Sequence, residues 1–176
     1  PLTWALVGLL FVVALVVRVA WLDSAPLILA GDEAQFAQEA VNLKDALQWR
    51  YNPFQLGIWH HPRLYHTLIA VSVTVLGQTA AAVRLPAAIF GALTVPAMYV
   101  FGRRMFDARI GWIAALFVAT FPLHVQFSRT GMDMTGDPLF VALAFALLVR
   151  ALRTDDRFEA ALAGAALGLS QYFYFA

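Results

Sequence analysis

The chain has 176 residues, of which 61% are hydrophobic and 13% charged, and its formal net charge at pH 7 is +1. Soluble domains carry about twice that charged fraction, so the composition predicts an integral membrane protein. The absence of cysteine excludes disulfides, thiolate chemistry and cysteine-based metal sites. No clustered basic stripe is present, which argues against nucleic acid as a partner.

The first predicted element is a membrane-spanning helix over residues 2–22, because about 20 mostly apolar residues cross a bilayer. This stretch lacks a basic N-terminal region and a small-residue cleavage site, which disfavours a signal peptide. The chain starts at Pro1 without a methionine and stops at Ala176 within an apolar run. We therefore expect it to be part of a longer protein.

Residues 23–84 are predicted to form one large external segment with two helices in the membrane interface. The first is expected over about 32–49, where apolar residues recur at helical spacing between polar ones. An amphipathic helix of this kind lies in the interface with its apolar face toward the lipid. The apolar positions are Phe36, Ala40, Leu43 and Leu47.

The second stretch, 64–77, has two interpretations, an interfacial helix or a short span. Its apolar part of about 13 residues would extend about 20 Å as a helix, short of the roughly 30 Å hydrocarbon core. If it lies flat, loops 102–109 and 150–157 fall on the same side of the membrane as the N-terminus. Each of these loops carries three arginines, and an excess of arginine is typical of cytoplasmic loops. If it spans, loop 102–109 moves outside. We therefore predict an interfacial helix, a cytoplasmic N-terminus and external acidic loops, in an inner or plasma membrane.

Four more spans are predicted after the external segment. They are residues 85–102, 110–127, 135–152 and 158–176. The expected fold is therefore an all-α integral membrane protein with about five transmembrane helices plus interfacial helices. Residues 1–176 would form the N-terminal part of one transmembrane domain. In this topology two pairs of acids lie on the same side of the membrane. The first pair is Asp32 and Glu33, and the second is Asp133 and Asp137.

The acids have a structural and a catalytic interpretation. Asp32 with Gln35 three residues later resembles a capping box, and carboxylates favour a helix N-terminus. Capping does not explain why Glu33 stands beside Asp32, or why a second acidic cluster faces the same side. In that cluster Asp137 precedes a proline and also fits a helix start, and Asp133 fits a solvated loop acid.

Histidines and arginines gather in the sequence WHHPR of the external segment. The imidazoles of His60 and His61 and the guanidinium of Arg63 are suited to binding a phosphate. A metal is an alternative, since His and Asp are both ligands, but adjacent imidazoles point apart in most backbones. The sequence is compatible with a divalent metal and does not require one. We expect His66 to face water and His124 to pack at the interface.

The order of motifs resembles the N-terminal part of a GT-C glycosyltransferase. It is similar to the superfamily of protein O-mannosyltransferases and lipid A aminoarabinose transferases, over nearly all of the chain. The family pattern has a second proline where Arg63 stands. The motifs, in order, are the acidic pair after the first span, HPRLY, VRLPAAIFGALTV, GRRMF, and SR followed at a distance by DPLF.

The resemblance implies an inverting membrane glycosyltransferase that uses a sugar carried on a polyprenyl phosphate. The acceptor would be a protein, lipid or glycan on the outer face. Asp32 would be the general base, Glu33 would orient or tune it, and Asp137 would position the acceptor or a metal. The substrate-binding residues predicted beside them are His61, Arg63, Arg129 and Asp133.

Two other functions are considered. A truncated or inactive relative would act as an accessory subunit of a larger membrane complex, with other membrane subunits as partners. A transporter is disfavoured, because these acids sit at span ends whereas transport relays bury acids within spans. A reading frame that continues with more spans would favour the enzyme, and a stop codon the accessory subunit.

Overall fold

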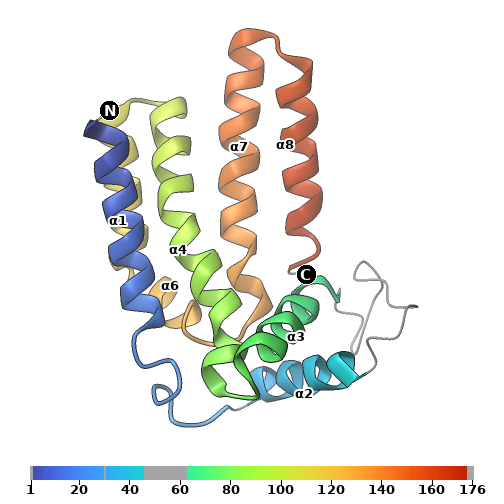
Figure 1. Cartoon of the computed structure of the whole chain (residues 1–176). Helices are drawn as coiled ribbons and strands as arrows, with labels where there is room; N and C mark the ends of the chain where they lie inside the picture. Colours follow the sequence, from blue (N-terminus) through green and yellow to red (C-terminus); the bar gives the residue numbers. More distant parts are fainter. Residues whose placement is uncertain (1, 30, 46–62, 174–176) are drawn as a thin grey trace.

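The computed structural model describes residues 2–29, 31–45 and 63–173, which form helices joined by short loops (Figure 1). No β-strand occurs within these ranges, and the predicted all-α fold class is confirmed. The elements are α1 Leu2–Val19, α2 Asp32–Asp45, α3 Leu64–Leu76, α4 Ala80–Met105, α5 Ala108–Thr120, α6 Pro122–Phe127, η2 Asp133–Thr135, α7 Asp137–Thr154 and α8 Arg157–Ser170.

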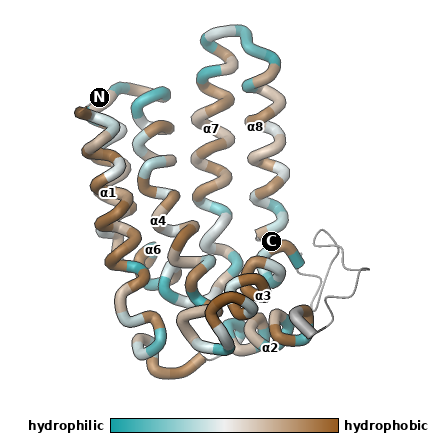
Figure 2. Tube along the Cα trace, in the orientation of Figure 1, coloured by the Kyte–Doolittle hydropathy of each residue, from teal (hydrophilic) through white to brown (hydrophobic). Residues whose placement is uncertain are grey.

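Three of the described helical stretches are long and apolar enough to cross a membrane, and they are Leu2–Val19, Ala80–Met105 and Asp133–Thr154. Figure 2 shows that α1 is hydrophobic along most of its length. The helices α3 and α5 are apolar but have only 13 residues each. These features support a membrane protein, as predicted.

The stretch expected as one span over 110–127 is two helices, α5 and α6. The break falls at Phe121, whose φ of −63° and ψ of 115° are extended rather than helical. The cause is Pro122, because a proline ring disfavours helical backbone at the residue before it. Pro122 then occupies the start of α6, where its missing N–H costs nothing.

Helix α4 is the centre of the bundle, with α1, α5 and α7 packed against it. The helices α2 and α3 pack on each other and lie across one end of the bundle, as Figure 1 shows. The N-terminus and the α7–α8 turn lie at the opposite end (Figure 1). The start of α2 and the loop before α7 therefore belong to the same end of the molecule.

Three hydrophobic clusters of described residues include part of α4, and two of them bear on the site. The cluster that we call the α2–α3 cluster includes Phe36, Ala40, Tyr65, Ile69, Val83 and Phe173. The cluster that we call the α1–α5 cluster consists of Val7, Ala14, Val95, Tyr99 and Ala115. The α2–α3 cluster packs the end of the bundle where the predicted acids lie. The α1–α5 cluster packs α1 against α4 and α5.

The two ends of the bundle are expected to react differently with an impermeant maleimide. Cysteines at the exposed positions Gln35 and Gln126 should be labelled from outside intact cells. Cysteines at the exposed positions Ala108 and Asp155 should be labelled only after permeabilisation, because the arginine-rich loops are predicted to be cytoplasmic. Labelling of position 108 in intact cells would contradict this orientation.

The crossing of α4 and α5 depends on Gly102 and Gly111. A Cβ on Gly111 would lie 2.7 Å from the carbonyl oxygen of Tyr99, and one on Gly102 would lie 2.9 Å from the Gly111 Cα. We expect Gly111→Ala to destabilise the protein by about 1–3 kcal/mol, the usual cost of overpacking. Thermal unfolding of the full-length protein in detergent measures this. Gly164→Ala is the control, since its Cβ would meet nothing within 4 Å, and equal melting temperatures for the two variants would refute the prediction.

Candidate functional site

Glu33, the second acid of the first pair, is buried in an ion pair with Arg84. Its Oε1 accepts a hydrogen bond from the Arg84 Nε at 2.7 Å, and its Oε2 accepts one from Nη2 at 3.2 Å. The two side chains are 6% and 0% exposed. The same Oε1 accepts a hydrogen bond from the backbone N–H of Gly131 at 2.7 Å. Glu33 thus joins α2 to α4 and to the loop before α7.

Arg84 uses its remaining donors on the loop that precedes α2. Its Nη1 donates to the carbonyls of Leu22 at 2.7 Å and Pro26 at 2.8 Å, and its Nη2 donates to that of Ile28 at 3.2 Å. This role of Arg84 was not predicted, although the sequence contains a signal for it. An arginine within an apolar helix such as α4 needs a partner, and the acids of the external segment were the available ones.

Asp32, the first acid of the pair, is exposed at the first position of α2. Gly31 precedes it with a φ of 57°, and the carbonyl of Gly31 accepts hydrogen bonds from the N–H groups of Ala34 and Gln35. Within the described ranges the Asp32 carboxylate accepts no hydrogen bond, so the predicted capping box is not formed there. Asp32 is therefore the member of the pair that solvent reaches.

The second acidic pair is also divided into a buried and a more exposed member. Asp133 is only 3% exposed, so its interpretation as a solvated loop acid is wrong, and its Oδ1 accepts a hydrogen bond from the N–H of Met134 at 2.8 Å. Asp137 is half-buried at the start of α7, where no side chain caps the helix. One acid of each pair thus remains accessible at this end of the bundle.

Tyr65 of α3 is a residue of this region that the sequence analysis did not single out. Its side chain is 0% exposed, and its hydroxyl has no hydrogen-bond partner in the part of the chain described. Burial, with smaller contributions from the charges of Asp133 and Glu33, raises the pKa of the Tyr65 phenol well above its usual value. The hydroxyl therefore stays protonated near two buried carboxylates. Only its place in the HPRLY motif hinted at a role.

Further along α2 and α3, Glu39 of α2 faces the start of α3. Its Oε1 lies 3.6 Å from the Arg63 Nε, and its Oε2 lies 3.4 Å from the His66 Nε2. His66 is 1% exposed, so the expectation that it faces water is wrong. Arg63 keeps 30% of its side chain exposed. The predicted site residue His61, and His60 beside it, lie outside the described residues.

Arg129 lies in a different environment, at the end of α1. Its Nη1 donates hydrogen bonds to the carbonyls of Val17 at 2.7 Å and Arg18 at 3.2 Å, and its Nη2 donates to that of Ala25 at 3.3 Å. Arg63 contacts Glu39 of α2 instead, so among the described contacts these two predicted phosphate-binding residues lie on different elements. Among the described side chains, no group of three His, Asp or Glu is placed to hold a metal ion.

Comparison with known proteins gives one family. Residues 60–176, about two thirds of the chain, match the dolichyl-phosphate-mannose-protein mannosyltransferases. The matched region includes Arg63, Asp133 and Asp137, and starts after Asp32 and Glu33. Neither the curated proteins nor the solved structures contain a match. The family consists of membrane glycosyltransferases with a lipid-phosphate sugar donor, which is the class that the motifs resembled. The chain belongs to the dolichyl-phosphate-mannose-protein mannosyltransferase family.

Proposed function

We propose that the full-length protein transfers a sugar from a polyprenyl phosphate to an acceptor hydroxyl on the outer face of the membrane. The observation that supports this proposal is the different environment of the two acids in the first pair, one buried and one exposed. Glu33 is fixed by Arg84 and Gly131, whereas the adjacent Asp32 is exposed and its carboxylate accepts no hydrogen bond from a described residue. A fixed neighbour and an accessible carboxylate are what a positioned general base requires.

The reaction needs a base because a hydroxyl is a poor nucleophile until its proton is accepted. A positioned carboxylate contributes about 10²–10⁴-fold to such a step. The acceptor oxygen bonds to the anomeric carbon of the sugar, its proton goes to Asp32, and the bond from that carbon to the phosphate oxygen breaks. The electron pair leaves with the lipid phosphate. A single displacement of this kind inverts the anomeric configuration.

The remaining predicted residues are assigned different roles. We assign Asp137 to positioning the acceptor or a divalent metal, because it is the accessible acid of the second pair. Asp133, which is buried, is assigned to substrate binding in the loop before Asp137. For the donor phosphate we place Arg63 first, with His61 two residues before it, since the Arg63 side chain is 30% exposed at the start of α3. Arg129 comes second, because its guanidinium caps α1.

The direct test is a transfer assay with the purified full-length protein in liposomes. Several polyprenyl-phosphate sugars would be supplied with peptide, lipid and glycan acceptors, with and without a chelator to determine whether a metal is needed. We expect the protein alone to form a product of inverted anomeric configuration. Transfer that appears only after a second membrane subunit is added would favour the accessory role instead.

The assignment of Arg63 leads to a kinetic prediction. Arg63→Ala should raise the KM for the lipid-linked donor about tenfold, since a charge-assisted bond to phosphate contributes roughly 1.5–3 kcal/mol. Arg129→Lys should change it less, because this variant keeps its charge and its residue lies at the end of α1. Initial rates at varied donor concentration measure both. A donor KM that Arg63→Ala leaves unchanged would remove Arg63 from the site.

A further inference from the structure

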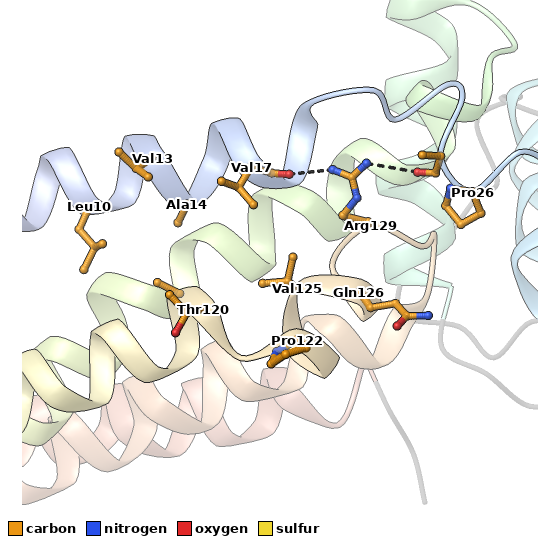
Figure 3. A pocket seen from close by; sticks show the side chains of 12 residues that line it. Leu10, Val13, Ala14, Val17, Pro26, Thr120, Pro122, Val125, Gln126 and Arg129 are labelled. Carbon is orange, nitrogen blue, oxygen red and sulfur yellow. Dashed lines mark hydrogen bonds between the residues drawn. The ribbon is translucent and has the colours of Figure 1, made fainter.

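A large apolar groove lies between α1 and the α5–α6 pair, on the side of the bundle away from α3. Its volume is about 720 Å³, and Figure 3 shows its lining side chains between α1 and the chain around Pro122. Val13 and Val17, which line it, are 50% and 47% exposed. The groove thus opens to the surface of the bundle that α1 presents to lipid. Its lining includes Leu10, Val13, Ala14, Val17, Pro26 and Val125.

One end of this apolar groove carries a cation. Arg129 lines the groove, and its guanidinium points between the end of α1 and the loop at Pro26 (Figure 3). The bonds to the carbonyls of Val17, Arg18 and Ala25 use the two terminal nitrogens. The Nε–H makes no hydrogen bond to any described residue, so capping of α1 leaves this donor for a ligand.

A second guanidinium, that of Arg18, lies behind the groove. It is 0% exposed and donates to the carbonyls of Ala14 at 3.1 Å and Val118 at 3.2 Å. Its Nη2 also lies 3.1 Å from the Nδ1 of His124. Among the described residues, the ion pairs of carboxylates are made with other side chains and not with Arg18 or Arg129. Two positive charges at this end of α1 thus lack an anionic partner in the described part of the chain, and an anion would be favoured there.

The donor of the proposed reaction is the weaker candidate for that anion, because its phosphate is assigned first to Arg63. None of the four predicted acids, Asp32, Glu33, Asp133 and Asp137, lines the groove. A lipid with its chain in the groove would instead lie against α1 and the α1–α5 cluster. The occupant that fits is a lipid of the surrounding bilayer.

We propose that this groove is a binding site for an anionic phospholipid, with an acyl chain between α1 and α5–α6 and the phosphate on Arg129. Arg129 is separated by one residue, Thr130, from Gly131, whose N–H donates to Glu33. A bound phospholipid would therefore brace the loop that fixes the acidic pair. The proposal concerns lipid binding and does not depend on the transfer reaction.

The test uses the full-length protein in nanodiscs with phosphatidylglycerol that carries a photoreactive group on its acyl chain. We expect cross-links on residues 10–17, and about tenfold less labelling when phosphatidylcholine replaces the anionic lipid. Arg129→Gln should lower labelling by phosphatidylglycerol by a similar factor. Val13→Phe, which fills the groove, should lower it too, whereas Val16→Phe should not, because Val16 is 60% exposed on the same helix and does not line the groove.

Two results would overturn the proposal. The first is labelling of α1 that neither Arg129→Gln nor Val13→Phe reduces relative to Val16→Phe, because the lipid would then be bound without groove or cation. The second is displacement of phosphatidylglycerol by equimolar polyprenyl phosphate, which would make the groove part of a donor site. Val13→Phe replaces a half-exposed side chain, so it keeps the test valid even if Arg129→Gln does not fold.

Discussion

Replacement of Asp32 by asparagine is expected to lower turnover by about 100-fold or more while the protein still folds and binds its donor. Asparagine has the size of aspartate and caps helices about equally well, so a purely structural role would survive the change. The carboxylate is exposed and accepts no hydrogen bond from a described residue, which leaves little for asparagine to disrupt. What the variant lacks is the basicity that accepts the proton of the acceptor.

Asp107 provides a matched control for this experiment. Its Oδ1 accepts hydrogen bonds from the N–H groups of Arg109 at 2.7 Å and Ile110 at 2.9 Å, so it caps α5 by its side chain. Asp107→Asn should leave both melting temperature and turnover close to wild type. If Asp32→Asn likewise transfers sugar within a few-fold of wild type, Asp32 is not the base and the accessory role gains support.

The helical fold could be predicted from the sequence because its signals are local. Apolar runs of about 20 residues mark α1, α4 and α7, and the helical spacing of Phe36 and Ala40 marks α2. The helix break at Phe121 could have been predicted, since Pro122 disfavours helical backbone at the residue before it. It was missed because the hydropathy of residues 110–127 is continuous across the break.

The candidate site was less predictable because its contacts join distant parts of the chain. Glu33 and Arg84 are 51 residues apart in sequence, and Glu33 and Gly131 are 98 apart. Composition and spacing identify an acid and an isolated arginine, but they do not show which groups meet. The same is true of the burial of Asp133 and His66, which depends on how the loop before α7 and the helix α3 pack.

The largest stability effect is expected at the Glu33–Arg84 ion pair. Arg84→Leu would leave Glu33 buried without its cation and would remove the donors to Leu22, Pro26 and Ile28. Removal of one partner from a buried pair costs about 3–5 kcal/mol, because the other charge remains uncompensated. Glu33→Gln should have a smaller effect of the same sign, since Arg84 keeps its three carbonyl acceptors and the amide oxygen can still accept from the N–H of Gly131. Unfolding of the full-length protein in detergent, followed by fluorescence, measures both.

A second arginine–glutamate pair separates this effect from a general loss of charge. Arg150 and Glu159 join α7 to α8 with an N–O distance of 3.0 Å, and their side chains are 53% and 11% exposed. Because the arginine of this pair is in water, its loss should cost less than the loss of the fully buried Arg84. Arg150→Leu should therefore unfold closer to wild type than Arg84→Leu. Equal unfolding of the two variants would mean that Glu33 is not held by Arg84 in solution, and Glu33 could then not position Asp32.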